Sequence, residues 1–327
     1  MVTRLTAVAL QLRIVKLTDF TIFDPSCILL MKTKIFIAIL FIIVIAGIII
    51  YLLIPSPIIV SNSITFKTSS NGAYRTLINQ DNWNRWSPQT FSVSKKLINT
   101  IELDFKNKNT AIPVSILLIP LSKDSVRISW KATFPEVSNP VSKIKQYLQA
   151  VSTRNEMDET LKKFQTFVER SENIYGIHIQ ETSTSDTLLV ATRFTSTTLP
   201  SNQLVYSNID KLRAYTAAAG ANISGAPMLN ISTIDSTLFS CMVALPIDKI
   251  VDDNGPIFFV RMVPGRFLTT EVTGGPHTIL FAHRMMDQYF KDFNRVSMAI
   301  PFEYLVTDRM KETDTTKWVT KVYGPVY

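Results

Sequence analysis

The stretch Val126-Arg-Ile-Ser-Trp-Lys-Ala-Thr-Phe134 decides the fold of the first half of the chain, because apolar and polar side chains alternate strictly along it. A period of two places successive side chains on opposite faces of a strand, so this segment predicts a strand with one buried face. Residues 101–105 and 112–118 show the same alternation. Short polar segments at 106–109 and 122–124 separate the three runs, which predicts an antiparallel meander.

The segments that flank the meander predict helices and one more strand. Residues 58–67 are expected to form a strand, and residues 69–79 a short helix capped by Ser69. Past Pro140 the apolar period becomes helical, which predicts a helical stretch over 141–151 and then a long amphipathic helix that ends near Asn173. The core positions of the long helix are Met157, Leu161, Phe164 and Val168.

Two tryptophans precede the meander. Trp83 and Trp86 are three residues apart, so they fall on one side of a helical turn. They either close over an apolar groove or complete an ordinary core.

This order of elements resembles the START-like polyketide cyclase superfamily (SRPBCC) over residues 58–174. The most specific match is Trp83-Asn-Arg-Trp86-Ser-Pro88, which is similar to the W-x-x-W-S-P turn after the first strand of that family. The resemblance implies a helix-grip fold, in which a curved sheet wraps the last helix around a hydrophobic cavity. Trp83 and Trp86 become candidate ligand contacts, and the additional stretch over 141–151 would cover or fill the cavity.

A run of twenty uncharged residues, Ile35 to Ile54, precedes these elements and is long enough to cross a hydrocarbon core of about 30 Å as a helix. Lys32 and Lys34 lie directly before it, and no charge follows until Lys67. The positive-inside rule therefore predicts a single-pass cell-membrane protein with a cytoplasmic N-terminus and extracytoplasmic, periplasmic domains. A cleaved signal peptide is the alternative, but its apolar core is shorter. Residues 1–30 are expected to be an extension without structure, and whether they are translated stays open.

Composition and charge narrow the class of protein. The chain has 327 residues, 46% of them hydrophobic and 18% charged, which indicates globular domains with an added apolar segment. The formal net charge is +8. The basic residues are scattered rather than gathered in a stripe, so nucleic-acid binding is not expected. Cys27 and Cys241 would lie on opposite sides of the membrane, so no intramolecular disulfide is expected.

Residues 176–327 repeat the order strand, helix, strands, which predicts two similar halves face to face with a cleft between them. The pattern resembles the GyrI-like small-molecule-binding (effector-binding) domain of bacterial multidrug-responsive activators. The segments that carry this resemblance are Gly225-Ala-Pro227, Val263-Pro-Gly265, Gly274-Gly275, Phe302-Glu303-Tyr304 and Lys321-Val-Tyr-Gly-Pro325-Val326.

Glu303 is an acid in an apolar strand, Ser297-Met-Ala-Ile-Pro-Phe-Glu-Tyr-Leu-Val306. Alternation places it on the face opposite Phe302 and Tyr304, with apolar neighbours on its own side. A carboxylate there needs a partner, which is a cation of the protein, water or a ligand. The GyrI-like resemblance implies that Glu303 lies at the base of an aromatic cleft and meets the ligand, with Trp318, Tyr304 and Phe302 as candidate walls.

Catalytic and metal-binding patterns are missing from the sequence. His178, His277 and His283 lack ligand spacing, and there is no G-x-S-x-G or H-E-x-x-H. No metal and no cofactor is expected, and an enzymatic role is not favoured.

We therefore expect an α+β fold class. The chain is expected to have one transmembrane helix at 35–54, a START-like domain at 58–174 and a GyrI-like domain at 176–327. We expect it to bind small amphipathic, apolar or cationic molecules as a sensor, carrier or sequestering protein. One alternative is a hydrolase of small electrophilic compounds with Glu303 as acid or base. Another is a structural protein whose pockets are filled by side chains. Ligand identity and oligomeric state stay open.

Overall fold

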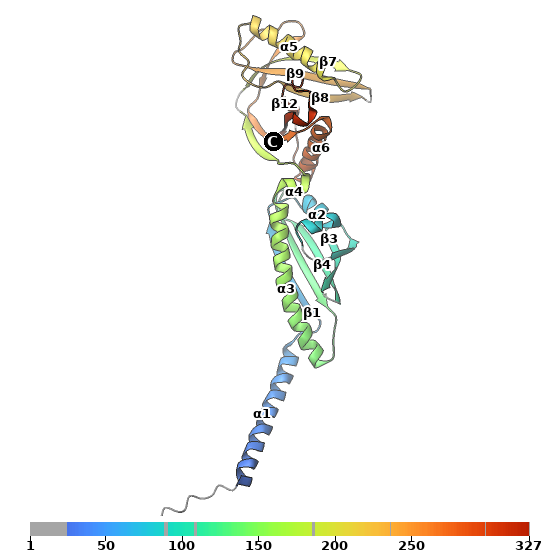
Figure 1. Ribbon diagram of the computed structural model, residues 1–327, viewed down its shortest axis with the longest axis vertical. Helices are drawn as coiled ribbons and strands as arrows, with labels where there is room; N and C mark the ends of the chain where they lie inside the picture. Colours follow the sequence, from blue (N-terminus) through green and yellow to red (C-terminus); the bar gives the residue numbers. More distant parts are fainter. Residues whose placement is uncertain are drawn as a thin grey trace, which may run out of the picture. The chain divides into compact units, whose positions relative to one another are not determined.

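The computed structural model describes residues 25–87, 91–107, 110–184, 187–235, 237–297 and 299–326. The chain divides into two compact units. One contains residues 1–56 and 137–147, and the other contains residues 57–136 and 148–327. Mixed helices and antiparallel sheets confirm the α+β class (Figure 1).

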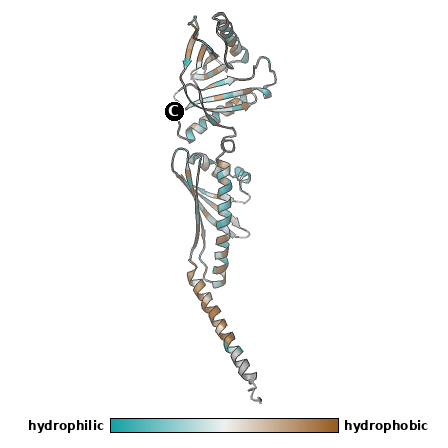
Figure 2. Ribbon diagram, turned by 90° about the vertical axis from the view of Figure 1, so that its left-hand side faces the viewer, coloured by the Kyte–Doolittle hydropathy of each residue, from teal (hydrophilic) through white to brown (hydrophobic). Residues whose placement is uncertain are grey.

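Helix α1 (Pro25–Leu53) contains the apolar run. Its segment Lys32–Leu53 is long and apolar enough to cross a membrane, a test that a signal sequence passes as well. The segment is hydrophobic along most of its length (Figure 2). The helix begins at Pro25, so residues 25–30 are helical although the sequence predicted no structure there. The rest of the predicted extension, residues 1–24, lies outside the described residues.

A five-stranded antiparallel sheet has the order β1-β5-β4-β3-β2. The predicted strand at 58–67 and the three-stranded meander are confirmed, while β2 was not predicted. The bounds are β1 (Ile58–Phe66), β2 (Phe91–Lys96), β3 (Thr100–Asn107), β4 (Thr110–Pro120) and β5 (Val126–Phe134). Helix α2 (Ser70–Ile78) begins as predicted, because the Ser69 side chain accepts a hydrogen bond from the Gly72 N–H. A 3₁₀ turn, η1 (Gln80–Arg85), follows.

Helix α3 (Pro140–Val168) joins what the sequence predicted as two helical stretches. No Gly or Pro interrupts residues 141–168, so the helix continues through the polar segment between the two apolar patterns. It ends at Val168 rather than near Asn173, and a short helix, α4 (Ser171–Tyr175), follows. Gly176 ends α4 with a φ of 72°, a left-handed conformation that favours glycine.

The C-terminal part forms one eight-stranded sheet of order β10-β7-β9-β8-β12-β13-β11-β6. The two halves are joined edge to edge, because β8 pairs with β12. The prediction that they lie face to face is therefore wrong. The strands are β6 (Gln180–Thr184), β7 (Thr187–Ser196), β8 (Met228–Asp235), β9 (Leu238–Ile247), β10 (Ile257–Met262), β11 (Gly265–Thr273), β12 (Phe302–Leu305) and β13 (Val319–Val326).

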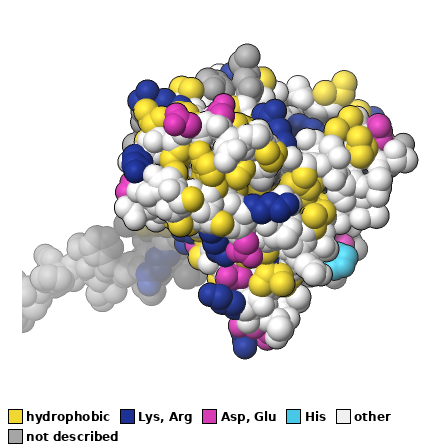
Figure 3. Space-filling model, turned by 90° about the horizontal axis from the view of Figure 1, so that it is seen from above, with side chains coloured by type: hydrophobic (Ala, Val, Ile, Leu, Met, Phe, Trp, Pro, Cys, Tyr) yellow, Lys and Arg dark blue, Asp and Glu magenta, His cyan; other side chains and the backbone are white. Residues whose placement is uncertain are grey.

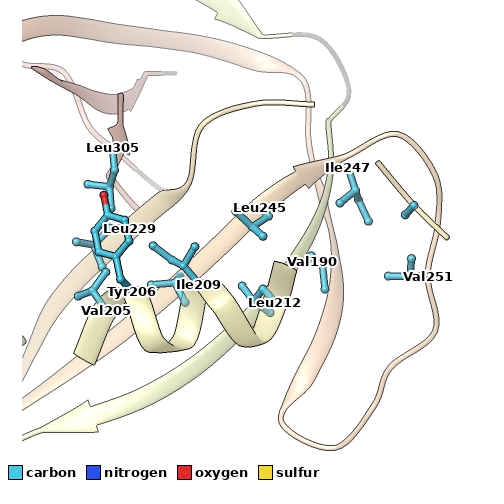
Figure 4. Packing of buried hydrophobic residues seen from close by; sticks show 12 residues of the cluster. Val190, Val205, Tyr206, Ile209, Leu212, Leu229, Leu245, Ile247, Val251 and Leu305 are labelled. Carbon is cyan, nitrogen blue, oxygen red and sulfur yellow. The ribbon is translucent and has the colours of Figure 1, made fainter. Parts of the chain in front are cut away.

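Two helices cover the same face of this sheet. Helix α5 (Asn202–Ala218) packs Ile209 and Leu212 against Val190 and Leu245, with Leu305 of β12 in the same cluster (Figure 4). Helix α6 (Pro276–Asp292) packs Ile279 and Met286 against β11 and β13. The opposite face carries a separate buried cluster without a residue of either helix: Leu189, Ala191, Met228, Ala244, Phe267 and Phe302.

Two local features fix the position of α6. A Cβ atom at Gly324 would lie 2.7 Å from the ring of Phe290, so the glycine allows α6 to approach β13 closely. At the C-terminal end of the helix, Asp292 is buried and accepts hydrogen bonds from Arg75 at 2.5 Å and from the Tyr175 hydroxyl at 2.8 Å. The Tyr175 pKa is raised, first by burial and then by the Asp292 charge.

Candidate functional site

An apolar cavity of about 330 Å³ lies on the face of the eight-stranded sheet that the helices leave uncovered. Phe267 and Phe302 belong to both its lining and the buried cluster of that face. Three methionines, Met228, Met242 and Met262, add flexible apolar surface. Among the described lining residues Arg266 is the one charged side chain. The remaining lining residues are Leu189, Leu229, Asn230, Ala244, Val260, Val263, Pro264, Gly265, Ala299, Ile300, Pro325 and Val326.

Strand β7, which borders the cavity, is apolar on both faces. In β7, Val190 points to the α5 cluster, whereas Leu189 and Ala191 belong to the cavity-side cluster. An apolar run without alternation indicates a strand that is buried on both sides. One side of β7 is covered by a helix, and the other side faces the cavity.

Aromatic rings extend the cavity face. Phe302 and Tyr323 are paired across β12 and β13, and their rings stack at 4.9 Å between centroids. Phe267 lies 5.7 Å from Phe302, and Tyr304 lies 5.6 Å from it. The hydroxyls of Tyr304 and Tyr323 have no hydrogen-bond partner within the described parts of the chain. Burial raises the Tyr304 pKa, so its hydroxyl stays protonated, and a hydrogen-bond donor, to a higher pH than that of an exposed tyrosine.

Glu303 lies on the other face of the same strand. It pairs across the sheet with Leu229 and Val322, which belong to the helix-side clusters. Its side chain is 12% exposed. One carboxylate oxygen is 3.0 Å from Nε2 of His283 on α6, and the other accepts a hydrogen bond from Arg309 at 3.3 Å. Protein cations or hydrogen-bond donors therefore occupy both oxygens, which is one of the alternatives that the sequence left open.

Arg309 connects this cluster to Trp318. The same guanidinium nitrogen donates to the Thr320 hydroxyl at 3.0 Å, and the guanidinium carbon lies 5.2 Å from the centroid of the Trp318 ring. Trp318 in turn donates from its indole nitrogen to the carbonyl oxygen of Glu312. Nε of Arg309 is buried and has no partner among the residues described. Trp318 is thus a neighbour of Glu303 in space, as predicted from the strand order, but on the helix side.

Trp83 and Trp86 lie in the five-stranded part. Both are buried, and their rings are 4.6 Å apart. Trp86 also lies 4.6 Å from Phe164 of α3, and Trp83 donates to the carbonyl oxygen of Leu77. The six predicted ligand-contact residues consequently form three groups: Phe302 with Tyr304, Glu303 with Trp318, and Trp83 with Trp86. Ligand contact by any of them stays a prediction.

Sequence reasoning missed the methionines of the cavity and one charged pair. Glu271 and Lys321 are paired across β11 and β13, with Nζ and a carboxylate oxygen 3.3 Å apart. The register places them on the same face as Tyr304, which pairs with Lys321. The sequence did contain one signal for the cavity. Apolar and polar side chains do not alternate in β7 and β9, which indicates that the second face of the sheet is also buried or borders a cavity.

A second, wider cavity of about 830 Å³ adjoins α3, α4 and α6. Its walls carry charges of both signs, and several of these charges are already paired, such as His178 with Glu172 and Arg295 with Glu181. Although it is larger, its lining includes many charged side chains, among them Lys67, Asp124 and Glu169, whereas apolar side chains line most of the cavity at Phe302. The smaller cavity is therefore the better candidate for an apolar ligand.

A cluster of metal ligands is not a feature of the described structure. No group of three or more His, Cys, Asp or Glu side chains that suits a metal ion occurs among the described residues. Cys241 is a buried free thiol, and burial raises its pKa. On the face shown in Figure 3, basic and acidic side chains are interspersed with apolar ones.

Comparisons with known proteins give only distant structural matches. No protein-family model matches the chain, and no curated protein matches it. The EcmrR–DNA complex matches with a TM-score of 0.42 and 13% identity, covering 57% of this chain and 69% of that chain. SAV2435 bound to tetraphenylphosphonium matches with a TM-score of 0.32 and 18% identity, covering 46% and 94%. A hydrolase from Listeria innocua matches with a TM-score of 0.36 and 9% identity, covering 46% and 91%.

The EcmrR C-terminal domain is also among the matched structures, with a TM-score of 0.38 and 14% identity. At these TM-scores and identities the similarity assigns neither a family nor a function to this chain. The START-like resemblance, the membrane anchor and the absence of nucleic-acid binding stay predictions.

Proposed function

We propose that this protein is a membrane-anchored binding protein for small, largely apolar molecules, which occupy the cavity beside Phe302. The single observation that carries the proposal is an apolar, methionine-rich and aromatic cavity of about 330 Å³. Ligand sites of proteins are concave, mostly apolar and lined by a few polar groups, and their volumes begin at about 300 Å³. Such a protein would sequester, carry or sense its ligand.

The chemistry of the walls defines the ligand class. Methionine side chains adapt to ligands of different shape, and aromatic faces attract delocalised cations. The hydroxyls of Tyr304 and Tyr323, which have no hydrogen-bond partner among the described residues, provide hydrogen-bonding groups at one end of the aromatic face. An apolar molecule with aromatic rings, with or without positive charge, satisfies all of these features.

Anchoring rests on helix α1, whose apolar segment has the length of a membrane span. Lys32 and Lys34 precede the apolar run, which supports a cytoplasmic N-terminus and ligand-binding domains on the other side of the membrane.

The hydrolase alternative has less support. A general acid or base needs an oxygen within reach of the substrate, and both carboxylate oxygens of Glu303 are engaged by His283 and Arg309. Turnover of small esters, lactones or epoxides that is lost in Glu303→Gln would establish the alternative instead.

The test is ligand-dependent thermal stabilisation of the full chain in detergent. Tetraphenylphosphonium, the ligand in the SAV2435 structure, and tetraphenylborate have similar shape and opposite charge. We expect tetraphenylphosphonium to raise the midpoint of unfolding more than tetraphenylborate does, because aromatic faces attract cations and the charge of Arg266 is already paired with Glu181.

Two matched variants locate the binding. Met242→Trp fills part of the cavity and should abolish the stabilisation, whereas Met310→Trp places the same substitution at an exposed position outside the cavity. Equal stabilisation of Met242→Trp and the unmodified chain would contradict the proposal.

A further inference from the structure

Helix α3 carries an apolar stripe on its exposed face. Val141, Ile144, Leu148 and Val151 recur at spacings of three and four residues, so they lie along one side of the helix. Val141 is 61% exposed and Leu148 62% exposed, while Lys143 and Ala150 on the opposite side are buried. The first three turns of α3 are therefore apolar on the side that faces away from the core.

The stripe ends within the helix. On the same face, positions further along α3 are occupied by Asn155, Glu159 and Lys162, which are exposed and polar. The exposed face of α3 is thus apolar at its start and polar further along. The polar part is ordinary solvated surface, so the apolar part needs an explanation in its own surroundings.

That reason is found at the start of α3, which contacts the end of the apolar helix α1. Both segments belong to the same compact unit. The Tyr51 hydroxyl donates to the carbonyl oxygen of Ser138 at 3.3 Å. Lys143 donates from Nζ to the Tyr51 carbonyl oxygen at 3.1 Å, and the same Nζ lies 4.3 Å from the centroid of the Tyr51 ring.

These contacts set the depth of the stripe relative to a bilayer. Tyr51 lies in the last turn of α1, at the end of the membrane-length segment, where tyrosine is enriched at the boundary between lipid and water. Lys143 directs the buried side of α3 to Tyr51, so the side that carries Val141 and Ile144 points outward, to the surroundings of α1. If α1 spans a bilayer, the surroundings at that depth are its interfacial layer.

We propose that the first turns of α3, with Val141 and Ile144 as contacts, lie in the interfacial layer of the outer leaflet and form a second contact with the membrane beside α1. The inference rests on the proposed membrane anchoring. An amphipathic surface of this type binds the boundary between headgroups and acyl chains through its apolar area. The exposed face becomes polar by Asn155 because the helix has left the lipid there.

The test uses the full chain reconstituted into phosphatidylcholine vesicles, with Cys27→Ser and Cys241→Ala to remove the native thiols. An environment-sensitive fluorophore is attached at single cysteines in Val141→Cys, Leu148→Cys or Asn155→Cys. These three positions are seven residues apart and lie on one face of the helix. Lipids with a spin label near the headgroup quench a fluorophore that lies in the interfacial layer.

We expect the strongest loss of fluorescence at 141, a weaker loss at 148 and none at 155. Fourteen residues of helix rise about 21 Å, whereas the interfacial layer is about 5–7 Å thick on each side. Equal quenching at 141 and 155, or no quenching at either, overturns the inference. A blue-shifted emission at 141 without lipid quenching also overturns it, because the stripe would then be covered by protein, such as a second copy of the chain.

A probe in Ile45→Cys separates this inference from the anchoring on which it rests. Ile45 lies within the apolar segment, so lipids with a spin label deep in the acyl chain quench it if α1 spans the membrane. Quenching at 45 without quenching at 141 refutes the interfacial contact alone. No quenching at 45 refutes the anchoring itself.

Discussion

The two faces of the eight-stranded sheet are built from the same strands, and they differ most around β12. The helix face buries a polar cluster in which Glu303 meets His283 and Arg309, while the cavity face is aromatic and apolar around Phe302. One residue step along β12 separates the two environments, because side chains alternate across a strand. Neighbours in sequence thus have different tasks: Glu303 joins β12 to α6, and Phe302 and Tyr304 face the cavity.

Removal of the cation on the helix face should have the largest effect on stability. Arg309→Met leaves the Glu303 carboxylate without its guanidinium partner in a nearly buried position, so we expect the free energy of unfolding to fall by about 3 kcal/mol. Urea unfolding of the full chain in detergent measures the change. Arg213→Met is the control, since its ion pair with Asp210 is exposed and contributes less than about 1 kcal/mol. Equal losses in both variants would show that the Glu303 cluster is not a buried interaction.

On the cavity face, truncation should act on binding. Phe302→Ala removes the ring that stacks on Tyr323 and lines the cavity, so the affinity for an apolar aromatic ligand should fall about tenfold, which corresponds to about 1.4 kcal/mol. Titration calorimetry with tetraphenylphosphonium measures it. Phe281→Ala on the exposed side of α6 is the matched control and should bind normally. A normal affinity in Phe302→Ala would place the ligand elsewhere.

The buried tyrosine at Asp292 gives a pH dependence. Burial and the Asp292 charge raise the Tyr175 pKa above its ordinary value, so the unfolded chain ionises first, near pH 10. Between that pH and the folded pKa the unfolded state binds fewer protons, and stability falls as pH rises, by up to about 1.4 kcal/mol per pH unit for one proton.

The slope should be flatter in Tyr175→Phe than in the unmodified chain, as measured by urea unfolding between pH 9 and 11, a range chosen around the ordinary tyrosine pKa of about 10. Burial also raises the Tyr304 pKa on the cavity face, with no carboxylate among the causes. Tyr304→Phe should therefore flatten the slope less. An unchanged slope in Tyr175→Phe would contradict the assignment.

Glu303→Gln should have the smallest effect of these substitutions and tests whether Glu303 contacts the ligand. Glu303→Gln keeps the shape of the side chain and a hydrogen-bond acceptor for Arg309, so the cavity face should not move. We expect ligand affinity within about twofold of the unmodified chain, a difference of less than about 0.5 kcal/mol. A loss near that of Phe302→Ala would instead establish the ligand contact that the GyrI-like resemblance implies.

Strand and helix positions were largely predictable because they depend on local periodicity. Residues 126–134 alternate and form β5, and Ser69 caps α2. Local signals did not predict the extent of α3. Its two segments have apolar residues on different faces, so they were predicted as two helical stretches although they form one helix. Local signals also failed at β12, which begins after Pro301 because proline has no N–H to donate to a neighbouring strand.

The candidate site was predictable only in part. The sequence indicated Glu303, Trp318, Phe302 and Tyr304 as residues of one strand pair, and the structure places them close in space but on two faces. The cavity methionines come from β8, β9 and β10, which are brought together by strand order rather than by spacing in the sequence.

The sequence by itself determined the apolar segment, the antiparallel strands and the face of β12 to which each side chain belongs, because these follow from composition and from the period of a helix or strand. Only the tertiary structure decided that two halves join into one sheet, that both helices cover the same face, and that a cavity lies on the other. Partner strands and covering helices come from distant parts of the chain, so the partner of Glu303 and the neighbours of Phe302 are fixed by packing and not by local pattern.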